Sequence, residues 1–397
     1  MPTSDLARFL LDPSTTFLNH GSFGACPRTV LEAQQAIQRE LEREPVRFFV
    51  HELGRRLDEA REEIARFVGS APAHLVFVRN ATEGVAAVLS SVAPMLGDGD
   101  ELLTTSHAYG ACKNALERVA NEMRARVVVA DVPFPIASAQ QVIDAIEAAV
   151  TPRTRLALID HVTSPTGLVF PIEAIVTRLE ARGVRVLVDG AHGPGMVLLA
   201  LDALGASYYT GNLHKWCCAP KGAGLLHVRA DRASEIHPAI TSHGMKSRRA
   251  RPMLWEEFDW TGTDDPSAWL CAPLAIREVG AMRSGGWPDV MAEQHEKAVR
   301  AQRALCDALG LETPAPAEML GALATVPLPA SAGPAPTSAW DTDPLWQRLE
   351  SVHRIQIPIF AWPAPPARLL RIACPLYVGE DDVAKLCAAL REELALA

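Results

Sequence analysis

The stretch YTGNLHKWCCAPKGAG, residues 209–224, places Lys215 between a histidine and a tryptophan in a tight connection. The segments around it, GASYYTG (205–211) and AGLLHVR (223–229), are apolar, aromatic runs bounded by glycine, which predicts two short β-strands. A lysine in an ordinary loop is usually a solvated charge. When it is partly desolvated, however, lysine loses its proton readily and attacks carbonyl groups. Lys215 is therefore a candidate nucleophilic amine.

Strand and helix patterns alternate on the N-terminal side of this stretch. A long helical pattern from about residue 27 to 68, interrupted near Pro45, comes first. The strand runs that follow, each with a helical pattern after it, are residues 74–80, 100–106, 125–133, 154–162 and 184–191. This succession requires βαβ crossovers, so we predict an α/β fold with a mostly parallel sheet and helices on both faces.

The C-terminal third has a different pattern. Helices are predicted at 265–284 and 287–309, followed by a Pro- and Ala-rich, loop-like span at 313–337. The run ARLLRIACPLYV (367–378) and a final helix complete the chain. A length of 397 residues is typical of two or three domains. We predict an N-terminal arm (1–20), a large domain (21–259) and a smaller C-terminal α+β domain (260–397).

Composition excludes several classes of protein. Hydrophobic residues make up 48% of the chain and charged residues 21%, as in globular proteins and unlike disordered ones. A net charge of −9, with only one short basic cluster at 246–251, argues against a nucleic-acid partner. No stretch approaches the roughly 20 apolar residues of a membrane span. The first 15 residues resemble neither a secretory signal nor a transit peptide.

The eight cysteines are scattered, and Cys217 and Cys218 are the only close pair. Adjacent cysteines seldom form a disulfide with each other, and no C-x-x-C spacing indicates a metal site. We expect a reduced, cytoplasmic chain without a bound metal.

Candidate ligand-binding residues lie at predicted strand ends, where open α/β sheets bind their ligands. Asp189 ends the run VRVLVD, and His192 follows in the same turn. An acidic residue there could instead cap the next helix. Thr82 begins the helix after 74–80, where unpaired N–H groups suit a phosphate, although a plain N-cap is the alternative. A phosphate site, a strand-end carboxylate and an activated lysine are three of the contacts that pyridoxal phosphate needs.

The pair VDGAHGPG (188–195) and YYTGNLHKWCCAPKGAG (208–224) resembles the class V branch of fold-type I pyridoxal-phosphate enzymes. Within that branch the chain is similar to the group of isopenicillin N epimerase and the C–S lyase of ergothioneine synthesis. Supporting matches, which extend over nearly the whole chain, are LNHGSFGACP (18–27), RNATEG (79–84), HAYGA (107–111), WTGTDDPSAWL (260–270) and LLRIACPLYV (369–378).

The resemblance implies that pyridoxal 5′-phosphate is the cofactor and that the large domain holds it. Lys215 would bond to it and act as the base at the substrate Cα, while Asp189 would keep the pyridine nitrogen protonated. His192 would lie beside the phenolic oxygen, with a merely structural hydrogen bond as the alternative. The residues implied to bind the phosphate are Ala81, Thr82, Asn212, His214 and, reaching over from the neighbouring subunit of a homodimer, Thr263.

The same resemblance implies the residues around the substrate. His107 or Tyr109 would lie over the cofactor ring, and both are candidate catalytic residues. Arg371, in an apolar strand where an unpaired charge is costly, would clamp the substrate α-carboxylate, with a structural ion pair as the alternative. Gly21 and Gly24 would let the N-terminal segment pass close to the site.

The implied activity is chemistry at the α-carbon of an amino acid or amino-acid conjugate through an external aldimine, as in isopenicillin N epimerase. The alternative is β-elimination by a C–S lyase such as hercynylcysteine sulfoxide lyase, and Tyr109 could serve as the acid in either reaction. An aminotransferase and a cysteine desulfurase are weaker alternatives. The nucleophilic loop cysteine of the desulfurases has no counterpart in 313–337, and we interpret Cys374 as a core residue. A non-catalytic regulator would need a DNA-binding module, for which the predicted domains leave no length.

Overall fold

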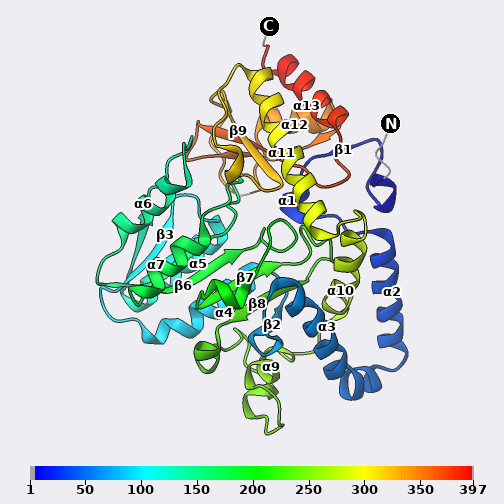
Figure 1. The fold of residues 1–397 in the computed structure, drawn as a ribbon, viewed down its shortest axis with the longest axis vertical. Helices are drawn as coiled ribbons and strands as arrows, with labels where there is room; N and C mark the ends of the chain where they lie inside the picture. Colours follow the sequence, from blue (N-terminus) through cyan, green and yellow to red (C-terminus); the bar gives the residue numbers. More distant parts are fainter. Residues whose placement is uncertain (1–4, 332, 339, 396–397) are drawn as a thin grey trace.

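The large sheet has seven strands, and helices cover both of its faces (Figure 1). The computed structural model describes residues 5–331, 333–338 and 340–395. The strands are β2 (Leu75–Val78), β3 (Glu101–Thr105), β4 (Arg126–Ala130), β5 (Thr154–Asp160), β6 (Arg185–Gly190), β7 (Tyr208–Asn212) and β8 (Gly224–Val228). Their order is β2-β8-β7-β6-β5-β3-β4, and β8 pairs antiparallel with both of its neighbours. The predicted α/β fold with a mostly parallel sheet is confirmed.

The helices form two layers around this sheet. One face packs against α4 (Ala81–Val92), α5 (Gly110–Met123) and α9 (Met253–Phe258). The opposite face packs against α2 (Arg28–Arg43), α3 (Leu53–Val68), α6 (Ala139–Ala149), α7 (Ile172–Ala181), α8 (Leu201–Leu204) and α10 (Ser267–Gly280). The long helical pattern predicted from about 27 to 68 is divided into α2 and α3 by the π-helical segment η2 (Arg47–Glu52).

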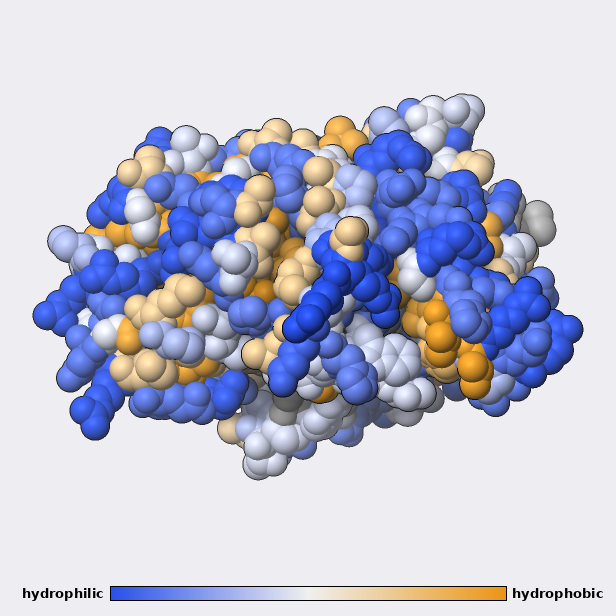
Figure 2. Space-filling model, turned by 90° about the horizontal axis from the view of Figure 1, so that it is seen from below, coloured by the Kyte–Doolittle hydropathy of each residue, from blue (hydrophilic) through white to orange (hydrophobic). Residues whose placement is uncertain are grey.

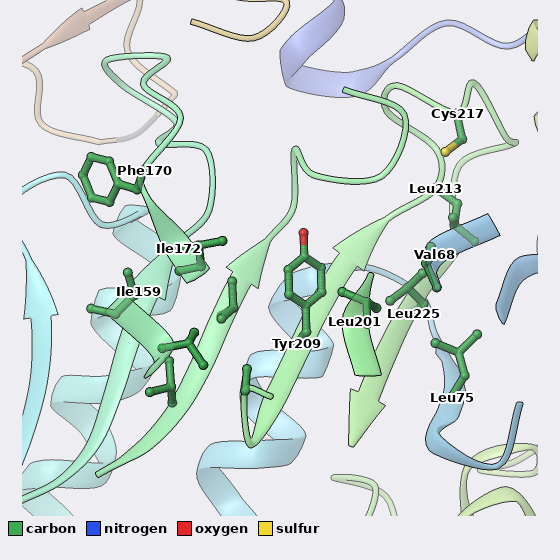
Figure 3. Packing of buried hydrophobic residues seen from close by; sticks show 14 of the residues in the cluster. Val68, Leu75, Ile159, Phe170, Ile172, Leu201, Tyr209, Leu213, Cys217 and Leu225 are labelled. Atoms are coloured by element: carbon green, nitrogen blue, oxygen red, sulfur yellow. The ribbon is translucent and has the colours of Figure 1, made fainter. Parts of the chain in front are cut away.

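Successive strand residues point to opposite faces, so both layers of the core receive side chains from every central strand. Tyr208 packs with α4 and α5, whereas Tyr209 packs on the other face. Figure 3 shows Tyr209 between Ile159 of β5 and Leu225 of β8. A Cβ atom on Gly190 would lie 2.1 Å from Cζ of Tyr209, so the absence of a side chain lets the tyrosine ring pack against the end of β6.

A smaller antiparallel sheet follows in the chain. It contains β9 (Leu323–Leu328), β11 (Ile359–Ala361) and β12 (Arg368–Ala373), in the order β11-β12-β9, and it packs with α11 (Trp287–Leu309), α12 (Pro344–Ser351) and α13 (Glu380–Glu393). The expectation of a loop-like span at 313–337 is wrong over β9. Pro327 is tolerated in this strand because β9 lies at the edge of the sheet, where a missing N–H leaves no ladder partner unpaired.

The N-terminal arm joins the two halves of the molecule. β1 (Thr16–Phe17) pairs in parallel with β10 (Ile355–Gln356), and α1 (His20–Phe23) then leads the chain to the large sheet. α10 packs on α2 and α3 although it comes after residue 260. The division into residues 1–20, 21–259 and 260–397 stays a prediction.

The surface mixes hydrophilic and hydrophobic groups, as Figure 2 shows for the face seen from below. Exposed hydrophobic side chains around η2 and in residues 240–253 are Val46, Val50, Ile240, Met245 and Met253. In the described part of the chain, no helix combines the length and the apolar character needed to cross a membrane. All eight cysteines are free and buried.

Candidate active site

A cavity of about 160 Å³ lies where β5, β6 and β7 end and α4 begins. This is the carboxyl edge of the sheet, where the sequence placed the ligand. Eight of the predicted site residues line it: Ala81, Thr82, Tyr109, Asp189, His192, Asn212, His214 and Lys215. Ser22, Asn80, Asp160, Val162, Ser164 and Ala191 complete the lining. Arg371 hydrogen-bonds to two of the lining serines, whereas His107 and Thr263 are not part of the lining.

The amine of Lys215 faces this cavity. Its Nζ lies 3.2 Å from Nε2 of His192. Burial, assisted by the positive charge of Arg371, lowers the pKa of Lys215 from 10.5 to about 7. A large share of the amine is therefore unprotonated near neutral pH, as nucleophilic attack requires.

The N-terminal segment packs against the backbone of the β7–β8 connection that carries Lys215. His20 is buried, with Nδ1 2.8 Å from the hydroxyl of Tyr377 and Nε2 3.0 Å from the backbone oxygen of Lys215. Gly24 has a φ of +71°, and a Cβ there would lie 2.0 Å from the backbone oxygen of His214. A Cβ on Gly21 would lie 3.4 Å from Nη2 of Arg371. The expected close passage of Gly21 and Gly24 is confirmed, whereas the role of His20 was not foreseen.

Asp189 lies at the end of β6, buried at the base of the cavity. One carboxylate oxygen accepts the backbone N–H of Ala191 at 3.0 Å, and the other accepts the thiol of Cys112 at 3.2 Å. The next helix, α8, begins at Leu201, so Asp189 is not its cap. A buried strand-end carboxylate suits a cationic group on a ligand.

Asp160 is a second buried carboxyl group in the cavity, and the sequence patterns did not single it out. It ends β5 and is the direct register partner of Asp189 in β6. Burial, together with the charge of Asp189, raises the pKa of Asp160 well above its ordinary value. Burial beside a second carboxyl group therefore favours the neutral, protonated form of Asp160. The signal that was available is the similarity of the runs RLALID and VRVLVD, each ending in aspartate.

The start of α4 forms the opposite end of the cavity. Asn80 caps this helix by accepting the backbone N–H of Glu83 at 3.0 Å, so Thr82 is not the N-cap. The backbone N–H of Ala81 donates to Oδ1 of Asn212 at 2.8 Å. A helix N-terminus beside amide and hydroxyl groups is a ready site for an anionic phosphate.

His214 adjoins this helix start. Its Nδ1–H donates to the backbone oxygen of Ala223 at 2.9 Å, so its Nε2 is the nitrogen left for the cavity. Burial lowers the pKa of His214 to about 4. A phosphate dianion beside Nε2 would shift that pKa upward, because it favours the charged imidazolium.

Arg371 is 2% exposed, so its guanidinium is a buried charge. Its guanidinium donates to the backbone oxygen of Ser164 at 2.5 Å, to the Ser164 hydroxyl at 3.2 Å and to the Ser22 hydroxyl at 3.2 Å. Burial lowers its pKa to about 10. Among the described residues no carboxylate forms an ion pair with it, so the structural ion pair that the sequence left open does not form there. A buried cation surrounded by hydroxyls fits an anionic ligand.

The structure separates the two candidates for the cofactor face. Tyr109 is 46% exposed and lines the cavity, and burial of its hydroxyl raises its pKa. His107 is 0% exposed, with Nδ1 2.7 Å from the Thr166 hydroxyl and Nε2 3.0 Å from the backbone oxygen of Val132. Because both nitrogens of His107 have partners away from the cavity, the arrangement favours Tyr109.

The donor set as a whole fits pyridoxal phosphate: an amine with a lowered pKa, a buried carboxylate and a helix N-terminus line one cavity. Residues 18–330 match the family model described as aminotransferase class-V. The chain belongs to the class V aminotransferase family. It is an enzyme of that family, and its cofactor is pyridoxal 5′-phosphate.

Relatives of this class V enzyme carry different activities in their names. Over 395 residues it is 34% identical to isopenicillin N epimerase of Amycolatopsis lactamdurans, with 96% of each chain covered. Over 398 residues it is 32% identical to a probable chloroplastic L-cysteine desulfhydrase of Arabidopsis thaliana, covering 96% of this chain and 83% of the relative.

Solved structures show that the fold is shared over the whole chain. The cysteine desulfurase CsdA of Escherichia coli superimposes with a TM-score of 0.78 at 20% identity, covering 100% of this chain and 99% of that one. A variant of C-DES with glycine covalently linked to its PLP cofactor gives 0.78 at 22% identity, covering 98% and 99%. At these identities the likeness concerns the fold alone.

Proposed function

We propose that this enzyme acts at the α-carbon of an amino acid or amino-acid conjugate and inverts its configuration, as isopenicillin N epimerase does. The observation that carries the substrate class is Arg371, a buried guanidinium without an acidic partner among the described residues, close to the cavity. An α-carboxylate supplies the missing negative charge and matches the guanidinium in geometry. The 34% identity to an epimerase supports the reaction type.

The residues of the cavity take distinct roles around the cofactor. When bound, pyridoxal phosphate supplies an electron sink that stabilises negative charge at Cα. Asp189 holds a proton at the pyridine nitrogen, and the start of α4 with Asn212 and His214 holds the phosphate. Lys215, whose pKa of about 7 leaves a substantial share of the amine unprotonated at neutral pH, removes the proton from Cα.

Tyr109 is the proposed second acid. Inversion at Cα requires a proton to return from the side opposite Lys215, and Tyr109 is a cavity-lining group that keeps its proton, because burial raises its pKa. The same hydroxyl could instead protonate a departing sulfur, which is the second candidate function. The 32% identity to a cysteine desulfhydrase favours that C–S lyase alternative.

Sulfur transfer through a cysteine persulfide has less support. Residues 313–337 contain no cysteine. Cys374 is buried, and burial raises the pKa of its thiol to about 12. A buried thiol with so high a pKa is a poor nucleophile at neutral pH.

Incubation with a panel of amino acids and cysteine conjugates in deuterated water distinguishes the two reactions. An epimerase yields substrate of inverted configuration with deuterium at Cα, whereas a lyase yields a keto acid and ammonia. In either case Tyr109→Phe should lower turnover by about 10²-fold or more, without loss of the bound cofactor. Full activity of this variant on a genuine substrate would remove Tyr109 from the mechanism.

The covalent role of Lys215 has a direct chemical test. Borohydride reduction of the purified protein, followed by peptide mapping, should place the pyridoxyl group on Lys215. Lys215→Ala should carry no covalent label. A label on Lys221, the other lysine in the same connection, would contradict the assignment.

We also propose that the enzyme is a homodimer in which Thr263 completes the phosphate site of the partner. Thr263 is exposed in the segment before α10 and does not reach its own cavity. Trp260, three residues before Thr263 in the chain, lines a surface hollow of about 610 Å³ together with the exposed side chain of Val50 from η2. Mixing Thr263→Ala with Lys215→Ala should restore partial activity, because one site of a mixed dimer carries neither defect. A monomeric active enzyme would contradict the proposal.

A further inference from the structure

Trp216, His192 and Lys215 form a hydrogen-bonded chain that ends at the cavity. The indole Nε1–H of Trp216 donates to Nδ1 of His192 at 3.2 Å. Nε2 of His192, the other ring nitrogen, lies 3.2 Å from Nζ of Lys215. Trp216 and His192 are buried, and Trp216 does not line the cavity.

The tryptophan decides where the proton of His192 sits. An indole nitrogen can only donate a hydrogen bond, so Nδ1 of His192 must be the unprotonated acceptor. Burial, with the charges of Lys215 and Arg371, lowers the pKa of His192 well below its ordinary value, so the ring is neutral. A neutral imidazole carries one proton, which is then on Nε2 and points to Lys215.

A proton on Nε2 in turn selects the state of the lysine. An ammonium group has no lone pair and cannot accept a hydrogen bond, whereas an unprotonated lysine nitrogen can. The contact between Nε2 and Nζ is therefore favourable only when that nitrogen is unprotonated. This is the state in which Lys215 can attack a carbonyl group.

We propose that Trp216 is a positioning residue that fixes the tautomer of His192, so that Nε2–H faces Lys215 and disfavours protonation of the lysine nitrogen. Only the benefit of an unprotonated Lys215 rests on the proposed function; the assignment of the His192 tautomer does not. The indole is held in place by its neighbours. The His20 ring packs against the indole with centroids 4.9 Å apart. Gly195 packs against the backbone of Trp216, where a Cβ on the glycine would lie 2.6 Å from the carbonyl carbon of Trp216.

Other charged and titratable groups act on Lys215 and His192 from neighbouring elements. Arg371 on β12 lowers the pKa of both groups, and His20 on α1 lowers that of His192. Asp189 on β6 and Cys112 on α5 raise the pKa of Lys215. A Trp216→Phe substitution leaves all of them in place, so a change in titration reports the lost indole bond.

The tautomer is measured directly by ¹⁵N NMR of holoenzyme labelled at histidine, because the two ring nitrogens of a neutral imidazole differ clearly in chemical shift. The His192 resonances are assigned with a His192→Phe variant. We expect Nε2 to be the protonated nitrogen in the wild type and Nδ1 to gain proton occupancy in Trp216→Phe. Protonation at Nδ1 in the wild type would overturn the proposal. This measurement does not depend on which reaction the enzyme catalyses.

A spectroscopic titration tests the consequence for the lysine. The pKa at which the bound cofactor changes colour should rise by about one unit in Trp216→Phe, the effect of losing one hydrogen bond. Trp287→Phe is the matched control, because its Nε1 donates to the backbone oxygen of Ile276 at 3.0 Å, away from the cavity. That variant should titrate like the wild type.

The same spectroscopic pKa, measured in a double variant, tests whether Trp216 acts through His192. In a His192→Phe background, Trp216→Phe should add no further shift. An unshifted titration in the single Trp216 variant, or an equal shift in Trp287→Phe, would overturn the proposal. If borohydride labelling were to miss Lys215 while the NMR result held, the proposed function would fail and the tautomer assignment would stand.

Discussion

Two arginines, Arg61 and Arg371, are equally buried and differ in what surrounds the charge. Arg61 of α3 is 0% exposed and donates to Asp58 at 2.6 Å and to Asp259 at 2.5 Å. Its guanidinium lies 4.1 Å from the ring centre of Trp255. Arg371 of β12 is 2% exposed, and its partners are the oxygens of serines together with the ring of Phe360 at 5.0 Å.

The difference teaches where a buried charge serves the fold and where it serves a ligand. Removing a guanidinium from water is costly in both places. Near Arg61 the carboxylates offset that cost within the chain, and Arg251 binds the same two aspartates. Near Arg371 the described residues supply no such offset, and burial lowers its pKa to about 10. An incoming carboxylate completes this site.

The largest expected effect is on catalysis, from Arg371→Met. Loss of the proposed carboxylate clamp should reduce kcat/KM by about 10³-fold, within the range for truncating a buried charge pair. The free energy of unfolding without substrate should stay the same or increase, because an unpaired buried charge disappears. Steady-state kinetics and chemical denaturation measure the two quantities. A large loss of stability in this variant would place Arg371 with the structural arginines.

Arg61→Met should produce the opposite pattern. Asp259 would lose one of its two guanidinium partners while it remains buried, which should lower the free energy of unfolding by about 2–3 kcal/mol. The methionine side chain can still pack on the ring of Trp255. Denaturation midpoints would report the loss, and kcat/KM per folded enzyme should stay within about twofold of the wild type. A selective loss of activity would break the comparison.

Lys215→Met in cofactor-free protein should show an effect on stability that depends on pH. The pKa of Lys215 is about 7 in the folded chain and 10.5 ordinarily, so the unfolded chain binds more protons between these values. The free energy of unfolding of the wild type therefore increases as the pH rises from about 7 to 10.5. The destabilisation caused by burying the Lys215 amine is greatest below pH 7.

The methionine variant has no amine to bury. Its free energy of unfolding should exceed that of the wild type most below pH 7, and the difference should shrink as the pH is raised to 9. Thermal unfolding at several pH values measures this difference. A constant difference would indicate that the Lys215 amine is not desolvated in the folded chain.

Much of this protein follows from local sequence. Alternating strand and helix runs predict the parallel sheet. They can be recognised in the sequence because apolar residues recur every two residues in a half-buried strand and every 3.6 residues in a helix. Strand ends and glycine-bounded turns then locate Asp189, His192 and Lys215, because a parallel sheet brings strand ends to one edge. The β9 strand was missed because the proline and alanine residues in and around it are not typical of strands. The edge of a sheet nevertheless tolerates a proline.

Only the tertiary structure decided how the charges are matched. The sequence held Tyr109 and His107 equal, and packing then enclosed His107 between Thr166 and Val132 while Tyr109 remained at the cavity. Strand register, which the sequence does not reveal, placed Asp160 beside Asp189. That no carboxylate of residues 5–331, 333–338 and 340–395 pairs with Arg371 is likewise a property of the packed chain. Burial and long-range neighbours set the pKa and the partner of each group, and they exist only once distant segments have packed together.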